Sequence, residues 1–233
     1  MNQRDVRPAG GRADRNNCQR CGTCCRKGPP GLHGEDRVLY DRGWVGKADL
    51  LTLRTGEWVY DNVLEQRIVL KEDMLRLRSK PQEAECLFFD VEGKRCRIYA
   101  VRPLECRILN CRDTTELIRI YKQDRLSRWD LIPRGSALED IMVHHETVCG
   151  YERIRHLAAA LRSKAAQRSS EVEELWAIIQ TDHTIRGSLQ EAAGVDGPVL
   201  DFLFGRPLTT TLPGFGLDLR KTDQGFRFLP CRM

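Results

Sequence analysis

The sequence predicts an α+β fold: a cysteine-rich half with short strands and helices, then a mainly helical half and a C-terminal hairpin. Eight of the ten cysteines lie before residue 112, among frequent glycine and proline residues. Long helical patterns with few helix-breaking residues fill the second half, and two short apolar segments follow them. We therefore expect a disordered arm over residues 1–17, a cysteine-cluster metal-binding region over 18–112, and a mainly helical region with the hairpin over 113–233.

The elements of the cysteine-rich half are expected to be short. Residues 18–34 have too few apolar side chains to fold unaided, so they should form a loop that a bound centre orders. Apolar residues along one side predict a helix over Lys47–Arg54, and Pro103 fits the first turn of a helix carrying Cys106 and Cys111. Short strands are expected at Glu57–Tyr60, Met74–Arg78, Cys86–Asp90 and Arg95–Tyr99, with a turn at Glu92 and Gly93 between the last two.

The second half reads as helical because its apolar residues recur at helical spacing. Helices are expected at Asp113–Tyr121, Ser136–Lys164 and Ser170–Ala193. Beyond them, strands at Leu217–Lys221 and Phe226–Leu229 should pair around a turn.

Composition and charge exclude several classes of protein. The chain has 233 residues, 41% of them hydrophobic, which is enough to pack a core. No run approaches the about 18 consecutive apolar residues of a membrane span, and the polar N-terminus lacks the apolar segment of a secretory signal peptide. The net charge of +5 is too small for a nucleic-acid-binding arm. We therefore expect a cytoplasmic protein that binds neither membrane nor nucleic acid.

Ten cysteines are many for a cytoplasmic chain, whose thiols stay reduced and more often bind metal than form disulfides. Two groups of four contain most of them: Cys18, Cys21, Cys24 and Cys25, and then Cys86, Cys96, Cys106 and Cys111. The first group spells C-x-x-C-x-x-C-C, which includes the spacing that wraps an iron–sulfur cube. Zinc sites more often use two C-x-x-C pairs, and the second group has none. The pattern favours a 4Fe–4S cluster, with zinc as the alternative.

Eight thiols can complete two four-cysteine sites, or one site with spares. Adjacent Cys24 and Cys25 project in different directions, so they serve two centres or one of them is a spare. Residues 94–112 hold six basic side chains against one acidic one, and guanidinium donors near a cluster offset its charge and raise its potential. The arginines expected to face the cofactor are Arg20, Arg97, Arg102 and Arg107.

Three motifs together resemble a known family. They are Cys18-Gln-Arg-Cys-Gly-Thr-Cys-Cys-Arg, Cys86-Leu-Phe-Phe-Asp and Gly93-Lys-Arg-Cys-Arg-Ile-Tyr-Ala-Val-Arg-Pro-Leu-Glu-Cys. They are similar to the YkgJ-type cysteine-cluster family, whose members are described as zinc- or iron-chelating, and the resemblance covers roughly residues 18–111. Flagellin lysine methylases, which carry an iron–sulfur cluster, share the pattern. The resemblance implies a metallocentre held by the eight clustered cysteines, and it implies no reaction.

Three further residues are candidate ligands. Cys149 follows His145 by four residues on an expected helix, so the two share a face and could add a ligand pair. Cys149 is included among the predicted metal ligands, although a packed cysteine beside a solvent-facing histidine is the favoured interpretation. His33 is expected to be a solvated loop residue, although it follows the first cysteine group closely enough to act as a ligand.

The sequence thus predicts an iron–sulfur protein that acts in electron transfer with a redox partner protein. The alternative is a zinc-stabilised structural or partner-docking module. An enzymatic role stays open, because no substrate pocket or catalytic residues can be named from the sequence.

Overall fold

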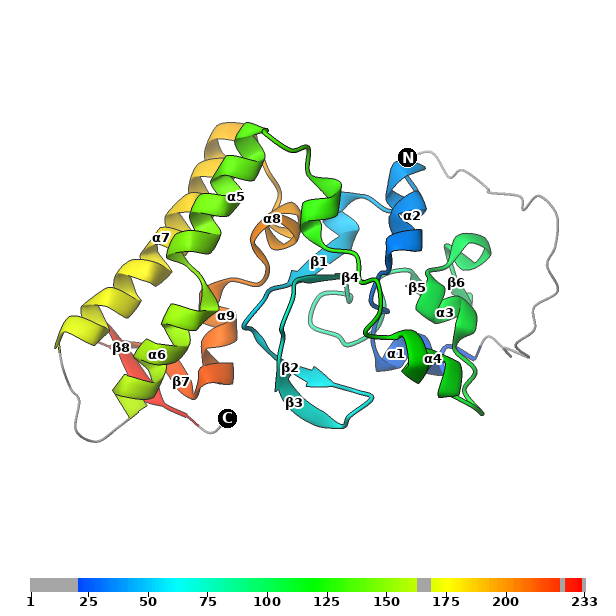
Figure 1. Cartoon of the computed structure of the whole chain (residues 1–233), viewed down its shortest axis with the longest axis horizontal. Helices are drawn as coiled ribbons and strands as arrows, with labels where there is room; N and C mark the ends of the chain where they lie inside the picture. The colour runs from blue at the N-terminus through cyan, green and yellow to red at the C-terminus, as the bar shows by residue number, and fades with distance from the viewer. Residues whose placement is uncertain (1–20, 163–168, 223–224, 232–233) are drawn as a thin grey trace. The chain divides into compact units, whose positions relative to one another are not determined.

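The computed structural model describes residues 21–162, 169–222 and 225–231, so the expected arm over residues 1–17 lies outside the described residues. The α+β prediction is confirmed: helices predominate, and the strands are short and antiparallel where their register is defined (Figure 1). By its internal contacts the chain forms two compact units. The first contains residues 21–50 and 75–126 of the described chain, and the second contains residues 51–74 and 127 onward.

Unit 1 is built from short elements. Its helices and 3₁₀ turns are α1 (Thr23–Lys27), η1 (Gly34–Asp36), α2 (Arg37–Asp41), η2 (Lys47–Asp49), η3 (Tyr99–Val101), α3 (Leu104–Ile108) and α4 (Thr115–Ile120). Its strands are β4 (Met74–Leu77), β5 (Phe89–Asp90) and β6 (Arg95–Cys96). The first residue of β4, Met74, is assigned to unit 2.

Extended backbone holds the centre of unit 1 together. Leu32 N–H donates to the Leu75 carbonyl at 2.9 Å, Leu75 N–H to Leu126 at 2.8 Å, and Leu126 N–H back to Leu32 at 2.9 Å. All three leucines are buried, so segments far apart in sequence share one small apolar core.

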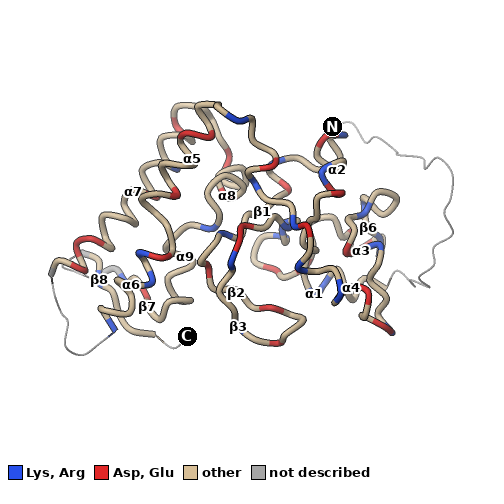
Figure 2. Tube along the Cα trace, in the orientation of Figure 1, with Lys and Arg blue, Asp and Glu red and all other residues tan. Residues whose placement is uncertain are grey.

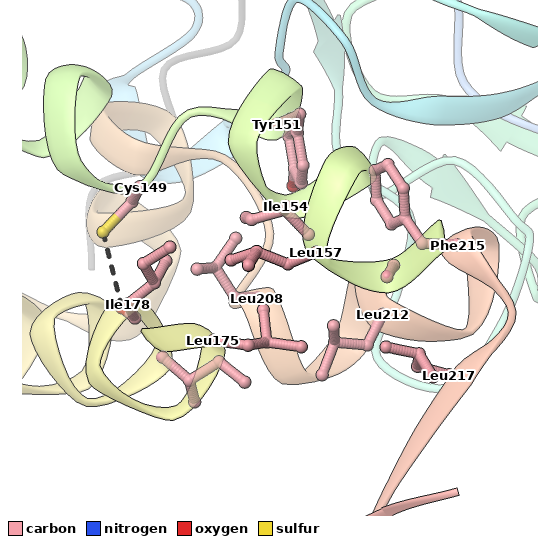
Figure 3. Close-up of a cluster of buried hydrophobic side chains, with 12 residues drawn as sticks. Cys149, Tyr151, Ile154, Leu157, Leu175, Ile178, Leu208, Leu212, Phe215 and Leu217 are labelled. Atoms are coloured by element: carbon pink, nitrogen blue, oxygen red, sulfur yellow. Dashed lines mark hydrogen bonds between the residues drawn. The ribbon is translucent and has the colours of Figure 1, made fainter. Parts of the chain in front are cut away.

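Unit 2 contains the longer helices and a larger core. Its elements are β1 (Leu50–Leu53, whose first residue belongs to unit 1), β2 (Trp58–Asp61), β3 (Gln66–Val69), η4 (Arg128–Leu131), α5 (Ala137–Val148), α6 (Tyr151–Arg162), α7 (Ser169–Ala193), α8 (Gly197–Phe204), α9 (Leu208–Thr211), η5 (Leu212–Phe215), β7 (Leu217–Thr222) and β8 (Gly225–Pro230). In its core, Ile154 and Leu157 of α6 and Leu175 of α7 point toward Leu208 and Leu212 (Figure 3).

The predicted hairpin at the end of the chain is confirmed. Strands β7 and β8 are antiparallel, with Leu217 opposite Pro230 and Thr222 opposite Gly225. Residues 223 and 224 of the expected turn lie outside the described residues. The part of the chain that the structure describes contains no helix that is long and apolar enough to cross a membrane.

Two predicted helices are wrong in form. Lys47–Arg54 is a single 3₁₀ turn followed by strand β1, because its apolar run is buried almost throughout, and periodicity cannot separate a buried strand from a buried helix. Ser136–Lys164 is two helices, α5 and α6, separated at Cys149 and Gly150. A side chain at Gly150 would crowd the Glu146 carbonyl, so glycine allows this break.

The strands also differ from the prediction in extent. β5 and β6 have two residues each, where five were expected for Cys86–Asp90 and Arg95–Tyr99. Strand β3 was missed, although it pairs with β2 from Trp58–Val69 to Asp61–Gln66. Helix α3 ends at Ile108, so it carries Cys106 but not Cys111.

Candidate metal centre

Local structure brings cysteines of both groups together. Cys24 and Cys25 lie on α1, a helix of five residues bounded by Gly22 and Gly28, both with positive φ. Cys86 N–H donates to the Cys25 carbonyl at 2.8 Å, so the backbone itself joins the first group to the second.

Strand β6 and helix α3 supply the other two cysteines of the site. Cys96 is paired with Phe89 across β5 and β6. Cys106 lies in the middle of α3.

The thiols of these five residues are close enough to change each other's protonation. Burial, and then the charges of Cys86, Cys96 and Cys24, raise the pKa of Cys106. Burial chiefly raises the pKa of Cys86 and of Cys96, and neighbouring thiolates add to both. We call this group the thiol cluster, and its members are Cys24, Cys25, Cys86, Cys96 and Cys106.

Within the thiol cluster, Cys24 and Cys25 affect each other's pKa in opposite directions. A hydrogen bond from Cys25 lowers the pKa of Cys24 to about 6, and the same bond raises the pKa of Cys25. The Cys24 sulfur is therefore a thiolate near neutral pH, held by the thiol of its neighbour. Because metals bind the thiolate form, such a pair is suited to a metal centre.

Arginine side chains act on the thiol cluster against the effect of burial. Arg102 lowers the pKa of Cys24 and Cys96, and Arg97 lowers that of Cys96 and Cys86. The Arg102 guanidinium lies 4.0 Å from the centre of the Tyr99 ring and donates to the Cys106 carbonyl at 3.3 Å. The Arg97 guanidinium donates to the Leu87 carbonyl at 3.0 Å. Both side chains are thus fixed by the same elements that carry the cysteines, where Lys and Arg recur along the trace (Figure 2).

The other predicted arginines differ in placement. Arg20 lies outside the described residues. Arg107 on α3 is paired with Glu35. Sequence reasoning missed Arg76, which lowers the pKa of Cys86 and donates to the Pro29 carbonyl at 3.3 Å. No motif marks Arg76, and only the fold of β4 brings it to this position.

The remaining clustered cysteines are outside the thiol cluster or outside the described chain. Cys21 is exposed, with its sulfur 3.2 Å from the Thr23 hydroxyl, and that contact lowers its pKa. Cys111 is exposed beside the bridge between Asn110 and Asp113. Cys18 lies outside the described residues.

Cys149 lies in the hydrophobic core of unit 2. Its thiol points to the Ile178 carbonyl at 3.6 Å, and burial raises its pKa to about 12 (Figure 3). These surroundings are those of a packed cysteine, so we do not include Cys149 in the ligand set proposed below. The solvent-facing orientation considered for His145 is wrong, since its ring is buried and hydrogen-bonded to Asp182 at 2.8 Å.

The thiol cluster suits a metal centre in its chemistry. All nine described cysteines are free, with no disulfide among them. Thiolate sulfur is the donor that zinc and iron–sulfur clusters take. Among the residues that the structure describes, however, no three His, Cys, Asp or Glu side chains are arranged as ligands of a single ion. The donors therefore fit a thiolate-bound metal centre in their chemistry.

Comparison with known proteins agrees with this chemistry. Residues 17–125 match the family described as "CxxCxxCC: Putative zinc- or iron-chelating domain". The matched segment contains the whole thiol cluster, as well as Cys18, Cys21 and Cys111. No curated protein matches the chain, and no solved structure matches it.

Proposed function

We propose that this chain, which carries a domain of the zinc- or iron-chelating cysteine-cluster family over residues 17–125, binds a 4Fe–4S cluster and acts in electron transfer. The observation that supports this most is the convergence of five free thiols from both cysteine groups. Four thiolates complete such a cluster, so the thiol cluster suffices for one centre. Cys18, Cys21 and Cys111 are candidates for a second.

The spacing of the second cysteine group along the chain favours a cluster over a single zinc ion, because that group contains no C-x-x-C pair. The Zn–S bond is about 2.3 Å, so four sulfurs around one ion must nearly touch. The described thiols affect each other's pKa without forming a set of three around one ion position. A centre with several iron atoms offers separate positions for ligands that stand further apart.

The surrounding residues are suited to tuning such a centre. When bound, a 4Fe–4S cluster accepts and releases one electron at a time. Arg76, Arg97 and Arg102 place positive charge beside the thiolates, which stabilises the more negative, reduced form. Cys24 is exposed, so an edge of the thiol cluster faces solvent, where a redox partner protein could approach.

Zinc is the second candidate, because the matched family is described as chelating either zinc or iron. In that case the metal would link α1, β6 and α3 into one structure, since each of these elements is too short to be stable alone. The domain would then serve as a structural or partner-docking module.

Anaerobic purification of the full chain followed by iron, sulfide and zinc analysis tests the proposal. We expect a brown protein with iron and sulfide in equal amounts and visible absorption that dithionite bleaches. Cys106→Ser should lose most of the iron, whereas Cys231→Ser, a change at a cysteine of unit 2, should retain it. Colourless protein with stoichiometric zinc would establish the second candidate instead.

A further inference from the structure

A buried carboxylate connects η1 to the helix that carries Cys106. Asp36 is 2% exposed, and its Oδ2 accepts the His33 backbone N–H at 3.0 Å. Its Oδ1 accepts the backbone N–H of Leu104, the first residue of α3, at 2.8 Å. One side chain thus closes its own turn and holds a helix start 68 residues away.

A second contact joins the same two segments. Glu105, next to Cys106, accepts the Gly31 N–H at 2.8 Å through Oε2. Its Oε1 lies 3.3 Å from Nε2 of His33, whose Nδ1 is 2.7 Å from the Gln123 carbonyl. The expectation of a solvated His33 is therefore wrong, because the ring is buried between two partners.

Helix α3 depends on these contacts for its position. It has five residues, none of them fully buried, and a helix this short is not stable by its own hydrogen bonds. Its N-terminal N–H groups also need acceptors, and Asp36 supplies one from outside the helix. Leu104, which Asp36 holds, is two residues before Cys106.

We propose that Asp36, with His33 and Glu105, is a positioning residue of the metal centre, which holds α3 so that the Cys106 sulfur lies among Cys24, Cys86 and Cys96. The inference rests on the proposed function in that Cys106 is taken as a ligand. It adds residues outside all the cysteine motifs, and it predicts how their loss affects one particular sulfur.

Asp49 provides a matched control in the same unit. It is the third residue of η2, and its Oδ2 accepts the Gly46 N–H at 2.8 Å, as Asp36 accepts that of His33. The Asp49 backbone carbonyl also accepts the Arg78 N–H at 2.8 Å, a bond that a change of side chain leaves in place, and the described bond of its side chain is the local one to Gly46. Asp49→Asn therefore removes a local turn bond alone, whereas Asp36→Asn also weakens the bond to α3.

The first test is a Co²⁺ titration of the reduced full chain, followed by its sulfur-to-cobalt absorption. We expect Asp36→Asn to weaken Co²⁺ binding about 10–100-fold, as loss of a residue that orients a ligand does, and Asp49→Asn to leave it unchanged within about twofold. The Asp36→Asn/Cys106→Ser double variant should bind no more weakly than Cys106→Ser alone, because both changes remove the same sulfur. Unchanged affinity in Asp36→Asn, or effects of the two changes that multiply, would overturn the proposal.

The second test needs no metal and therefore separates this proposal from the function proposed above. Phenylarsine oxide bridges neighbouring thiols, and peptide mapping identifies which ones. We expect a bridge that includes Cys106 in the wild type and in Asp49→Asn, and its loss in Asp36→Asn. If the wild type forms no such bridge, or Asp36→Asn forms it equally, Asp36 does not position Cys106. A wild type that binds no Co²⁺ but forms the bridge would instead rule out a single-ion site at these thiols and leave the positioning role of Asp36 standing.

Discussion

The ring of Phe89 lies against the α-carbon of Gly22, leaving no room for a side chain there. A β-carbon at position 22 would overlap ring atoms Cζ, Cε1 and Cε2 of Phe89. Gly22 stands between Cys21 and Cys24 of the first cysteine group, and Phe89 belongs to the Cys86-Leu-Phe-Phe-Asp motif. The two motifs are therefore in direct contact, and the glycine is what permits their close approach.

Gly22→Ala should displace α1 and with it Cys24 and Cys25. The change adds two costs: a left-handed residue with φ of 77°, and an overlap with a buried ring, which together should amount to roughly 2–4 kcal/mol. Gly43→Ala is the control, because Gly43 has φ of 69° in the same unit but nothing within 4 Å of a new β-carbon. Metal content and the midpoint temperature of thermal unfolding should both fall much further in Gly22→Ala than in Gly43→Ala. Equal losses in the two variants would contradict this.

The cysteine motifs could be recognised in the sequence, whereas some of the other side chains around them could not. The spacing of the cysteines indicated one or two centres shared by two distant groups. The fold brings five of these eight cysteines near one another, and their role as ligands stays a prediction. The positions of Arg76 and His33 could not be predicted, because both depend on partners brought near by the fold: the Pro29 carbonyl, and the Gln123 carbonyl with Glu105. No local pattern records such contacts.

Secondary structure was predicted best where it is local. The C-terminal hairpin depends on a short turn between two apolar segments, and it formed as expected. Lys47–Arg54 was predicted as a helix and became strand β1, in which Thr52 donates to the Phe202 carbonyl at 2.5 Å. A contact across 150 residues outweighs the helical spacing of a few leucines.

Arg128 should be essential to the stability of unit 2. Its buried guanidinium donates to Asp73 at 2.9 Å, to the Leu203 carbonyl at 2.6 Å and to Glu146 at 2.6 Å. Arg128→Met removes all three bonds, although Asp73 keeps Trp129 and Glu146 keeps Arg54 as donors. The free energy of unfolding should fall by about 3–5 kcal/mol. Arg128→Lys should recover little of this loss, because the lysine ammonium lacks the planar guanidinium that reaches all three acceptors.

Urea unfolding followed by circular dichroism measures the effect at Arg128. Arg220→Met is the control, since Arg220 pairs with Asp218 at an exposed site and should contribute about 1 kcal/mol or less. A loss below about 1 kcal/mol in Arg128→Met would show that unit 2 does not depend on this contact.

Asp182 should make unit 2 sensitive to acid. The carboxylate is buried, and the His145 ring, Arg186 and the Leu208 N–H hold its pKa at about 2, below the usual 3.8. Because the pKa of Asp182 is lower in the folded chain than in the unfolded chain, its contribution to the free energy of unfolding is fully present above about pH 4. That contribution is lost as the pH falls toward 2. The shift corresponds to roughly 2 kcal/mol.

Unfolding free energies measured between pH 7 and pH 2 test this. The difference between wild type and Asp182→Asn should shrink by about 2 kcal/mol below pH 4. Asp218→Asn is the control, because Asp218 is an exposed partner of Arg220 and the change should cost about 1 kcal/mol or less. A constant difference across the pH range would mean that Asp182 is not held ionised by its partners.

Arg102 should tune the thiol cluster through its charge. The guanidinium lowers the pKa of both Cys24 and Cys96, and its contacts with Tyr99 and Cys106 fix it in place. In the metal-free chain, Arg102→Leu should therefore raise the pKa of Cys24, which is measured as the pH at which iodoacetamide alkylation accelerates.

If the chain binds an iron–sulfur cluster, loss of the Arg102 charge should also lower the reduction potential, because the reduced centre is the more negative one. Arg119→Leu is the control, since Arg119 is exposed on α4 and paired with Glu116. If Arg102→Leu leaves both the alkylation profile and the potential unchanged, the arginine acts only as a structural contact, and the charge compensation predicted for this site must come from Arg76 and Arg97.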